Sequence, residues 1–440
     1  MSTLSSVAGV LLVALTFRTA VGTAGTAPET AVGALTAALH MVASASHVEG
    51  CDLFVAAGSP LVAARDAVRA ALRTRPDAAV NSDLVVCLDG GVYDGGISFD
   101  ASDSPSPGHG KVIWRGSRSA ANPTIVSGGV QITGWKAASL AGKSTFAAPV
   151  PAGVATLKAV RQLWVSGQRA NRTTIQLGLC ADCKLNMSSR CAFSYGDRAA
   201  SSDVCPTPAE PFCIGYEDNV SWGKCGAPGG TGVRSLFTSW GANASGAVGF
   251  TTASPLPTAW RGNGKTANAI EFVWPIVIRN WIEPRCTLRS IVGNNITLAH
   301  ACGNFLRSRH GALPPPPLRI EGAPPTAPLA SGEFYHDVVA GVLYYTPRPG
   351  VGAQSAAELD AAAWVAAEEV LLSVNGTARH TWEGVTFRYA TWGQANSDDG
   401  YVASQATVHA CTSGGSCEPL GAVRVSDARD VTFARCTFEH

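Results

Sequence analysis

Residues 385–392 read VTFRYATW and residues 431–438 read VTFARCTF, so the pattern V-T-F-x-x-x-T-aromatic occurs twice. The copies begin 46 residues apart (431 − 385 = 46), which is two turns of about 23 residues in a solenoid with the usual repeat of about 20–30 residues. The repeat predicts that both V-T-F segments are parallel strands of one sheet, with Phe387 and Phe433 stacked in the core. Chance similarity between two amphipathic strands is the alternative interpretation.

Short β-prone runs separated by glycine fill the earlier part of the chain. They are LVVCL (84–88), GISF (96–99), KVIWRG (111–116), PTIVSGG (123–129) and VQITGW (130–135). Their spacing leaves no room for helices between them, which is typical of a sandwich, a barrel or a solenoid. An amphipathic segment, LVAARDAVRAALR at 61–73, precedes them, with Leu61, Ala64 and Val68 on one helical face. The pattern predicts one helix followed by an all-β chain.

The middle of the chain differs from its ends in amino-acid composition. Residues 176–232 hold six cysteines among many Gly, Ser and Pro, which is typical of a loop stapled by disulfides. Strand-like runs return over 233–310, and EFYHD and VLYYTP predict a hairpin across 333–347. The Ala/Glu-rich stretch at 354–370 predicts either a helix or the lead-in to a strand.

The cysteines and the sequons indicate an oxidising compartment. Thirteen cysteines exceed what a reducing compartment usually holds. There are six N-x-[ST] acceptors: Asn171, Asn186, Asn219, Asn243, Asn295 and Asn375. The apolar run at 7–17 has the length of a signal-peptide core but no preceding Lys or Arg, so a cleaved signal and a buried or misassigned start are both open. We expect an extracellular glycoprotein.

Cysteine spacing suggests particular disulfides. The expected pairs are Cys51 with Cys87, Cys286 with Cys302, and Cys411 with Cys417, which leaves Cys436 as the odd thiol. Cys180-x-x-Cys183 has a zinc-like spacing, but no His pair accompanies it, so disulfides are favoured and no metal or other cofactor is expected.

Charge narrows the class of partner. Lys and Arg number 33 against 32 Asp and Glu, a net charge of +1, so no electrostatic case exists for nucleic acid or an anionic membrane. No later run has the about 20 apolar residues of a membrane span. The oligomeric state is left open.

Several pieces, in order, resemble the secreted right-handed parallel β-helix proteins similar to β-helical glycoside hydrolases, of pectin-lyase-like fold. They are AARDAVRAAL, VCLDGGVYDGGISF, KVIWRGS, NPTIVSGGVQITGW, RQLWVSGQRANRT, NWIEPRC, GEFYHDVVAGVLYYTPRPG, VTFRYATW and DGYVASQATVH. The resemblance implies an all-β fold: a right-handed parallel β-helix with an N-terminal capping helix and an inserted β-sandwich-like module. It also implies that the catalytic carboxylates lie in coils after VTFARCTFEH, so we expect this chain to lack the complete catalytic site.

The expected organisation follows from these observations. It comprises a signal peptide (1–25), a spacer (26–54), the capping helix and first coils (55–150), the inserted module with its Cys-rich loop (151–350), and further incomplete coils (351–440).

Candidate site residues cluster between the two repeats. Glycoside hydrolysis needs two carboxylates about 5–9.5 Å apart, and Asp398 and Asp399 are the local candidates, although they could instead be turn residues before Gly400. Trp392, Tyr401 and His409 could form a sugar platform or pack against the inserted module.

Glu283, in WIEPRC, could face substrate or form a local ion pair with Arg285.

The first functional hypothesis is a secreted, carbohydrate-directed protein of glycoside-hydrolase ancestry that acts on or binds polysaccharide. The alternative is a non-catalytic glycan-binding or cell-surface structural module. A Ca²⁺-dependent lyase ranks third, because no acidic run suits calcium.

Overall fold

The structure is a computed structural model. It describes residues 50–74, 82–155, 157–176, 237–243, 246–252, 256–261, 269–273, 283, 285–293, 295–299, 319–396, 403–405, 408–411 and 415–440. The expected signal peptide, most of the spacer and the Cys-rich loop lie outside these ranges. The described part is mostly β-structure with few helices, which confirms the all-β expectation.

Three sheets are parallel throughout. The first contains, in spatial order, β1 (Leu53–Val55), β2 (Leu84–Leu88), β5 (Val112–Arg115), β24 (His380–Glu383) and β30 (Thr432–Ala434). The second contains β3 (Gly91–Asp94), β6 (Thr124–Ser127), β25 (Val385–Arg388) and β31 (Thr437–Glu439). The third contains β4 (Ile97–Phe99), β23 (Leu372–Asn375) and β29 (Val423–Ser426). From β2 onward the chain visits the first, second and third sheets in that order each time.

Strand pairing corrects the register of the sequence repeat. Thr381 pairs with Thr432 in the first sheet, and Thr386 pairs with Thr437 in the second. The structural repeat is therefore 51 residues (432 − 381 = 51), and the predicted pairing of the two V-T-F segments in one sheet is wrong. Strands of both the first and the second sheet contain a Thr followed by an aromatic residue. The offset of 46 residues therefore aligned β25, in the second sheet, with β30, in the first sheet.

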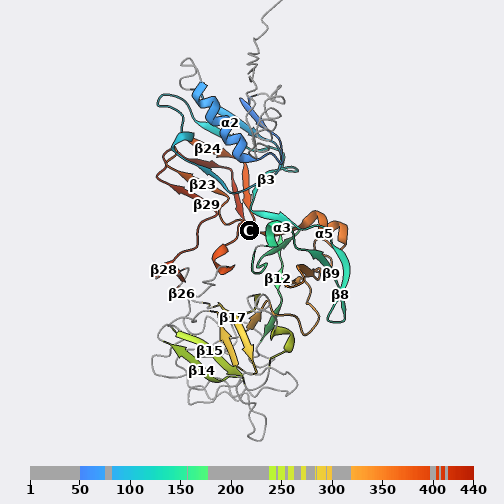
Figure 1. The fold of residues 1–440 in the computed structure, drawn as a ribbon. Coiled ribbons are helices and arrows are strands. Elements are labelled where there is room, and N and C mark those ends of the chain that lie inside the picture. Colours follow the sequence, from blue (N-terminus) through green and yellow to red (C-terminus); the bar gives the residue numbers. More distant parts are fainter. Residues whose placement is uncertain are drawn as a thin grey trace, which may run out of the picture.

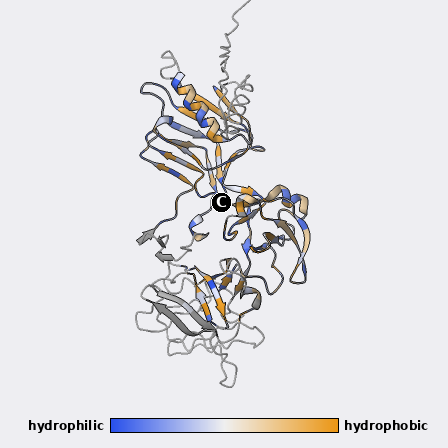
Figure 2. Cartoon of the chain, viewed as in Figure 1, coloured by the Kyte–Doolittle hydropathy of each residue, from blue (hydrophilic) through white to orange (hydrophobic). Residues whose placement is uncertain are grey.

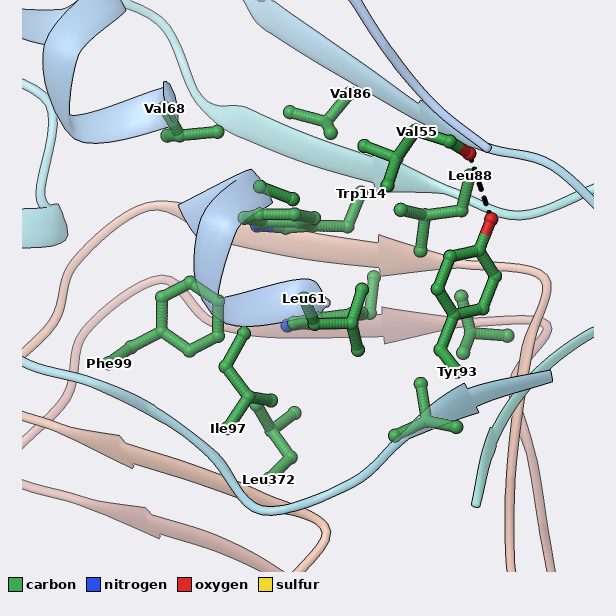
Figure 3. Close-up of a cluster of buried hydrophobic side chains, with 14 of the residues drawn as sticks. Val55, Leu61, Val68, Val86, Leu88, Tyr93, Ile97, Phe99, Trp114 and Leu372 are labelled. Atoms are coloured by element: carbon green, nitrogen blue, oxygen red, sulfur yellow. Dashed lines mark hydrogen bonds between the residues drawn. The ribbon is translucent and has the colours of Figure 1, made fainter. Parts of the chain in front are cut away.

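The helix α2 (Leu61–Thr74) covers the hydrophobic core between the parallel sheets, and it confirms the helix predicted over 61–73. Its Leu61, Ala64 and Val68 are buried there. Figure 3 shows Leu61 and Val68 in this core, and Figure 2 shows that the helix also carries hydrophilic residues. Arg69 fixes the helix by a bidentate ion pair with Asp103, at 2.6 Å and 2.9 Å, and the Asp103 side chain is fully buried. Asp103 belongs to the short helix η2 (Ala101–Asp103).

Between β6 and β23 the chain leaves the parallel sheets and forms sheets that are antiparallel except for the parallel pair of β12 and β20. The first part comprises β7 (Gly129–Gln131), β8 (Lys136–Leu140), β9 (Lys143–Pro149), α3 (Ala152–Ala155), β10 (Leu163–Val165), β11 (Gln168–Arg169), β12 (Asn171–Arg172) and β13 (Thr174–Gln176). The second comprises β14 (Phe237–Asn243), β15 (Gly246–Thr252), η3 (Thr258–Arg261), β16 (Glu271–Val273), β17 (Arg285–Val292), β18 (Asn295–Leu298) and β19 (Arg319–Glu321). The third comprises β20 (Glu333–Asp337), β21 (Val342–Tyr345), α5 (Ala356–Ala362) and β22 (Ala363–Ala366). β20 and β21 confirm the predicted hairpin, and residues 354–370 contain both a helix and a strand.

The segment between β6 and β23 is the first excursion of the chain from the parallel sheets. A second, shorter excursion begins at the same corner. It runs from β25 to β29 through η6 (Gly393–Asn396), β26 (Ala403–Gln405), β27 (Val408–Cys411) and β28 (Gly415–Cys417). Tyr389 marks this corner: its ring stacks on Trp364 at 5.8 Å and on His440 at 5.1 Å. In Figure 1 the C-terminus accordingly lies between the parallel sheets and the antiparallel ones. Both excursions thus begin beside the same aromatic stack.

Cys51 and Cys87 form the predicted disulfide, which ties the segment before β1 to β2. Cys286 is also disulfide-bonded, but its expected partner Cys302 lies outside the described residues. Within the described part of the chain Cys436 is a free, half-buried thiol, as expected. The side chains of Cys411 and Cys417 are not described, so their pairing stays a prediction. None of the described helices is long and apolar enough to cross a bilayer.

Replacing both Cys51 and Cys87 with serine is expected to lower the free energy of unfolding by about 2–4 kcal/mol, because the disulfide closes a loop spanning 36 residues and restricts the unfolded chain. Chemical denaturation measures this loss. Cys436→Ser is the control and should cost less, because it removes no cross-link. Equal stability of the double variant and the wild type would contradict the prediction.

Candidate functional site

A cleft of about 760 Å³ lies where the second excursion meets the antiparallel sheets. Its walls come from three places in the chain: the segment from β10 to β13, the strands β17 and β19, and the start of the second excursion. The charged residues that line it are Arg161, Arg169, Arg172, Arg285, Arg319, Glu321 and Glu333, and Trp392, Thr391, Asn171 and Gln162 add polar and aromatic groups. An arginine-rich wall with an aromatic side chain suits a polar ligand.

Glu271 anchors one end of the arginine cluster. Its side chain is buried, and its carboxylate accepts hydrogen bonds from Arg161 at 2.5 Å and from Arg172 at 2.7 Å. Burial alone would disfavour the charged carboxylate, but the nearby guanidinium groups outweigh it and lower the pKa of Glu271 to about 2. Glu271 is therefore a fixed negative charge at neutral pH.

Glu321 and Glu283 anchor the other end. Arg285 donates to Glu321 at 2.5 Å and to Glu283 at 2.7 Å, while Arg319 donates to the same two carboxylates at 2.7 Å and 2.9 Å. Burial again opposes ionisation, but Arg285 and its neighbours keep the pKa of Glu321 below its usual range. The sequence WIEPRC predicted either a substrate-facing Glu283 or a local ion pair. The structure contains the local ion pair between Glu283 and Arg285.

Arg169 differs from the other four arginines. Within the described part of the chain it makes no ion pair, and its side chain lies in the cleft wall with part of its surface exposed. Partial burial, followed by repulsion from Arg285, lowers the pKa of Arg169. Its backbone is held firmly, because Arg169 pairs with Trp164 in the β10–β11 hairpin and its carbonyl accepts a hydrogen bond from Arg348 at 2.7 Å.

A tight turn before Arg169 sets the direction of β11, which contributes to the cleft wall. Ser166 and Gly167 join β10 to β11 with φ values of 51° and 73°. A two-residue hairpin turn of this kind needs positive φ at both positions, which glycine adopts without strain. The turn therefore sets where Arg169 lies.

Two groups beside the arginines suit a sugar. Trp392 lines the cleft just before η6, and indole rings pack on the apolar faces of pyranoses. The Oε1 atom of Gln162 is buried in the wall and accepts no hydrogen bond from a described residue. An unsatisfied buried amide oxygen costs about 1–3 kcal/mol, so a ligand hydroxyl at this point would be stabilising.

The structure brings together only part of the predicted site. Trp392 lines the cleft, and Glu283 belongs to the ion-pair network behind it. Asp398, Asp399 and Tyr401 lie outside the described residues, and His409 is described only as backbone in β27.

Sequence reasoning named only Arg285 among the arginines that line the cleft, and only as a local partner of Glu283. Their signal was weak: three of them fall within RQLWVSGQRANR, at residues 161–172, and the others alternate with Glu in the short segments EPR and RIE. Such spacing is equally typical of a solvated strand. The partners lie far apart in the chain, so spacing alone could not show that they meet.

Glu271 and Glu321 do not suit acid catalysis. A general acid must hold a proton near neutral pH, whereas arginines keep Glu271 and Glu321 ionised. These two carboxylates hold arginine side chains in place and are not poised to donate a proton.

Comparison with known proteins gives one informative match. No family model and no curated protein matches the sequence. A solved structure described as "Glycoside hydrolase" matches with a TM-score of 0.52 at 20% identity. This chain shares the fold of that glycoside hydrolase. The match covers 87% of this chain but only 58% of the other, so this chain spans less than two thirds of the length of the protein it resembles.

Proposed function

We propose that this chain is a secreted, carbohydrate-directed protein that binds polysaccharide in the cleft beside Trp392. One observation carries the proposal: a cleft with an aromatic side chain and hydrogen-bonding groups lies in a chain that shares the fold of a glycoside hydrolase. The disulfide between Cys51 and Cys87 supports an extracellular location, because such bonds persist in oxidising compartments.

The same proposal includes the architecture. Three parallel sheets visited in a constant order support a right-handed parallel β-helix capped by α2. The antiparallel sheets between β6 and β23 are then a module inserted into one coil, which revises the proposed start of the module from residue 151 to Gly129. In this scheme the second excursion is a loop of the next coil.

The test is to incubate the purified chain with xylo-, fuco- and pectic oligosaccharides and to measure both binding and release of reducing sugar. We expect binding without steady turnover. Trp392→Ala should weaken binding about 2–10-fold, since loss of an aromatic platform removes about 0.5–1.5 kcal/mol. Trp364→Ala is a matched control, because Trp364 packs on Tyr389 and does not line the cleft.

Hydrolysis through Asp398 and Asp399 is the second candidate function, and the fold shared with a glycoside hydrolase favours it. Steady release of reducing sugar that Asp399→Asn abolishes would establish this enzyme function and refute the binding-only proposal. Absence of binding to every oligosaccharide would refute both.

A further inference from the structure

We propose that the cleft recognises an acidic saccharide, with Arg169 pairing with a carboxylate or sulfate group of the sugar. This inference rests on the proposed function, because it names the class of glycan that the same cleft takes. A neutral sugar would need hydrogen-bonding groups and an aromatic platform, but it would not need a cluster of guanidinium groups.

The charges around the cleft are not balanced. Five arginines line it, whereas the carboxylates in its wall and behind it are Glu271, Glu283, Glu321 and Glu333. Glu333 lies at the margin, where its Oε2 accepts the N–H of Ala330. One positive charge therefore remains in excess within a partly enclosed space, where the interaction of charges is stronger than in open water.

Arg169 is the one arginine of this cluster that pairs with no carboxylate among the described residues. Arg161 and Arg172 share Glu271, while Arg285 and Arg319 share Glu321 and Glu283, so these four guanidinium groups are satisfied. Arg285 repels Arg169, while Glu321 attracts it without forming an ion pair with it. A bound anion would offset this repulsion and form a charge-assisted hydrogen bond with the planar guanidinium group.

The surroundings of Arg169 select a sugar rather than a bare anion. Gln162 offers an unsatisfied acceptor to a hydroxyl, and Trp392 lines the same cleft, where an indole ring suits a pyranose. Thr174 lines the same wall. A small inorganic anion could satisfy Arg169 but could not use these groups at the same time.

The test compares three oligosaccharides with one backbone: chondroitin sulfate, which carries sulfate and uronate groups; desulfated chondroitin, which keeps the uronate; and carboxyl-reduced desulfated chondroitin, which is neutral. Isothermal titration with the full chain measures each affinity at neutral pH. We expect an acidic form to bind at least tenfold more tightly than the neutral form, and added salt to weaken only the acidic forms. The first two probes distinguish recognition of sulfate from recognition of carboxylate.

Arg169→Gln should reduce the affinity for the acidic probe about 10–100-fold, as expected for a lost charge-assisted hydrogen bond, and should leave the neutral probe unaffected. Arg118→Gln is the matched control, because Arg118 is exposed in the turn after β5 and its loss changes the net charge equally. An equal loss in both variants would overturn the role of Arg169.

Other outcomes separate this inference from the proposed function. Equal binding of acidic and neutral probes would overturn the inference and leave carbohydrate binding intact. Failure of every saccharide to bind would overturn both. Tighter binding of a single-stranded oligonucleotide than of any saccharide would also overturn the inference, because the cleft would then recognise phosphate and bases.

Discussion

Trp114→Ala is expected to lower the free energy of unfolding by about 3–5 kcal/mol, because removing a fully buried tryptophan leaves a cavity in the core. The Trp114 ring stacks on Trp382 at 5.1 Å and 10°, and it meets Phe99 edge-to-face at 5.4 Å. Its indole N–H also donates to the buried His380. Equilibrium denaturation monitored by circular dichroism measures the loss.

The control for this experiment is Val62→Ala, on the exposed side of α2. Val62 is 46% exposed, so its truncation should change stability by less than about 0.5 kcal/mol. A Trp114→Ala variant as stable as the Val62→Ala variant would mean that β5 and β24 are not neighbours in the core. The expected difference therefore tests the pairing of two coils as well as the packing of one side chain.

Glu271→Gln is expected to cost about 3–5 kcal/mol of folding free energy, because it leaves Arg161 and Arg172 beside a neutral amide in a buried site. The variant should also change the dependence of stability on pH. In the folded chain the pKa of Glu271 is lowered from 4.5 to about 2. Its stabilising contribution is thus complete above pH 4.5 and disappears as the pH falls towards 2.

Thermal unfolding between pH 2 and pH 7 measures both effects. The wild type should lose stability more steeply than Glu271→Gln as the pH falls from 4.5 to 2, and the two curves should converge at the acid end. Glu418→Gln, at an exposed glutamate after β28, should follow the wild type. Parallel curves for wild type and Glu271→Gln would contradict the assigned ion pairs.

Local elements could be predicted from the sequence. Apolar residues at helical spacing placed α2 within one residue, and the run LVVCL became β2 without adjustment. Cys51 and Cys87 paired as expected. The helix and the strand depend on residues that are near one another in the chain. The disulfide depends on cysteine, a residue type that offers few possible partners. Such information is present in a single sequence.

The register of the coils could not be derived in the same way. The Thr-aromatic pattern of Thr381-Trp382 recurs five residues later as Thr386-Phe387, so two alignments of the repeat fit the letters equally well. Only pairing across the sheet chose between them, by placing Thr432 beside Thr381. Because the excursion between β25 and β29 adds residues to the coil, its length also concealed the structural repeat.

The sequence alone therefore determined the helix, the short strands, the all-β class and an oxidised cysteine pair, because these follow from local periodicity and residue chemistry. The tertiary structure alone decided the cleft. Arg161 meets Glu271 across 110 positions of sequence, and Arg285 meets Glu321 across 36. These contacts form only after antiparallel strands from separate segments pair, since a charge pattern does not specify which distant partner will be brought within hydrogen-bonding distance.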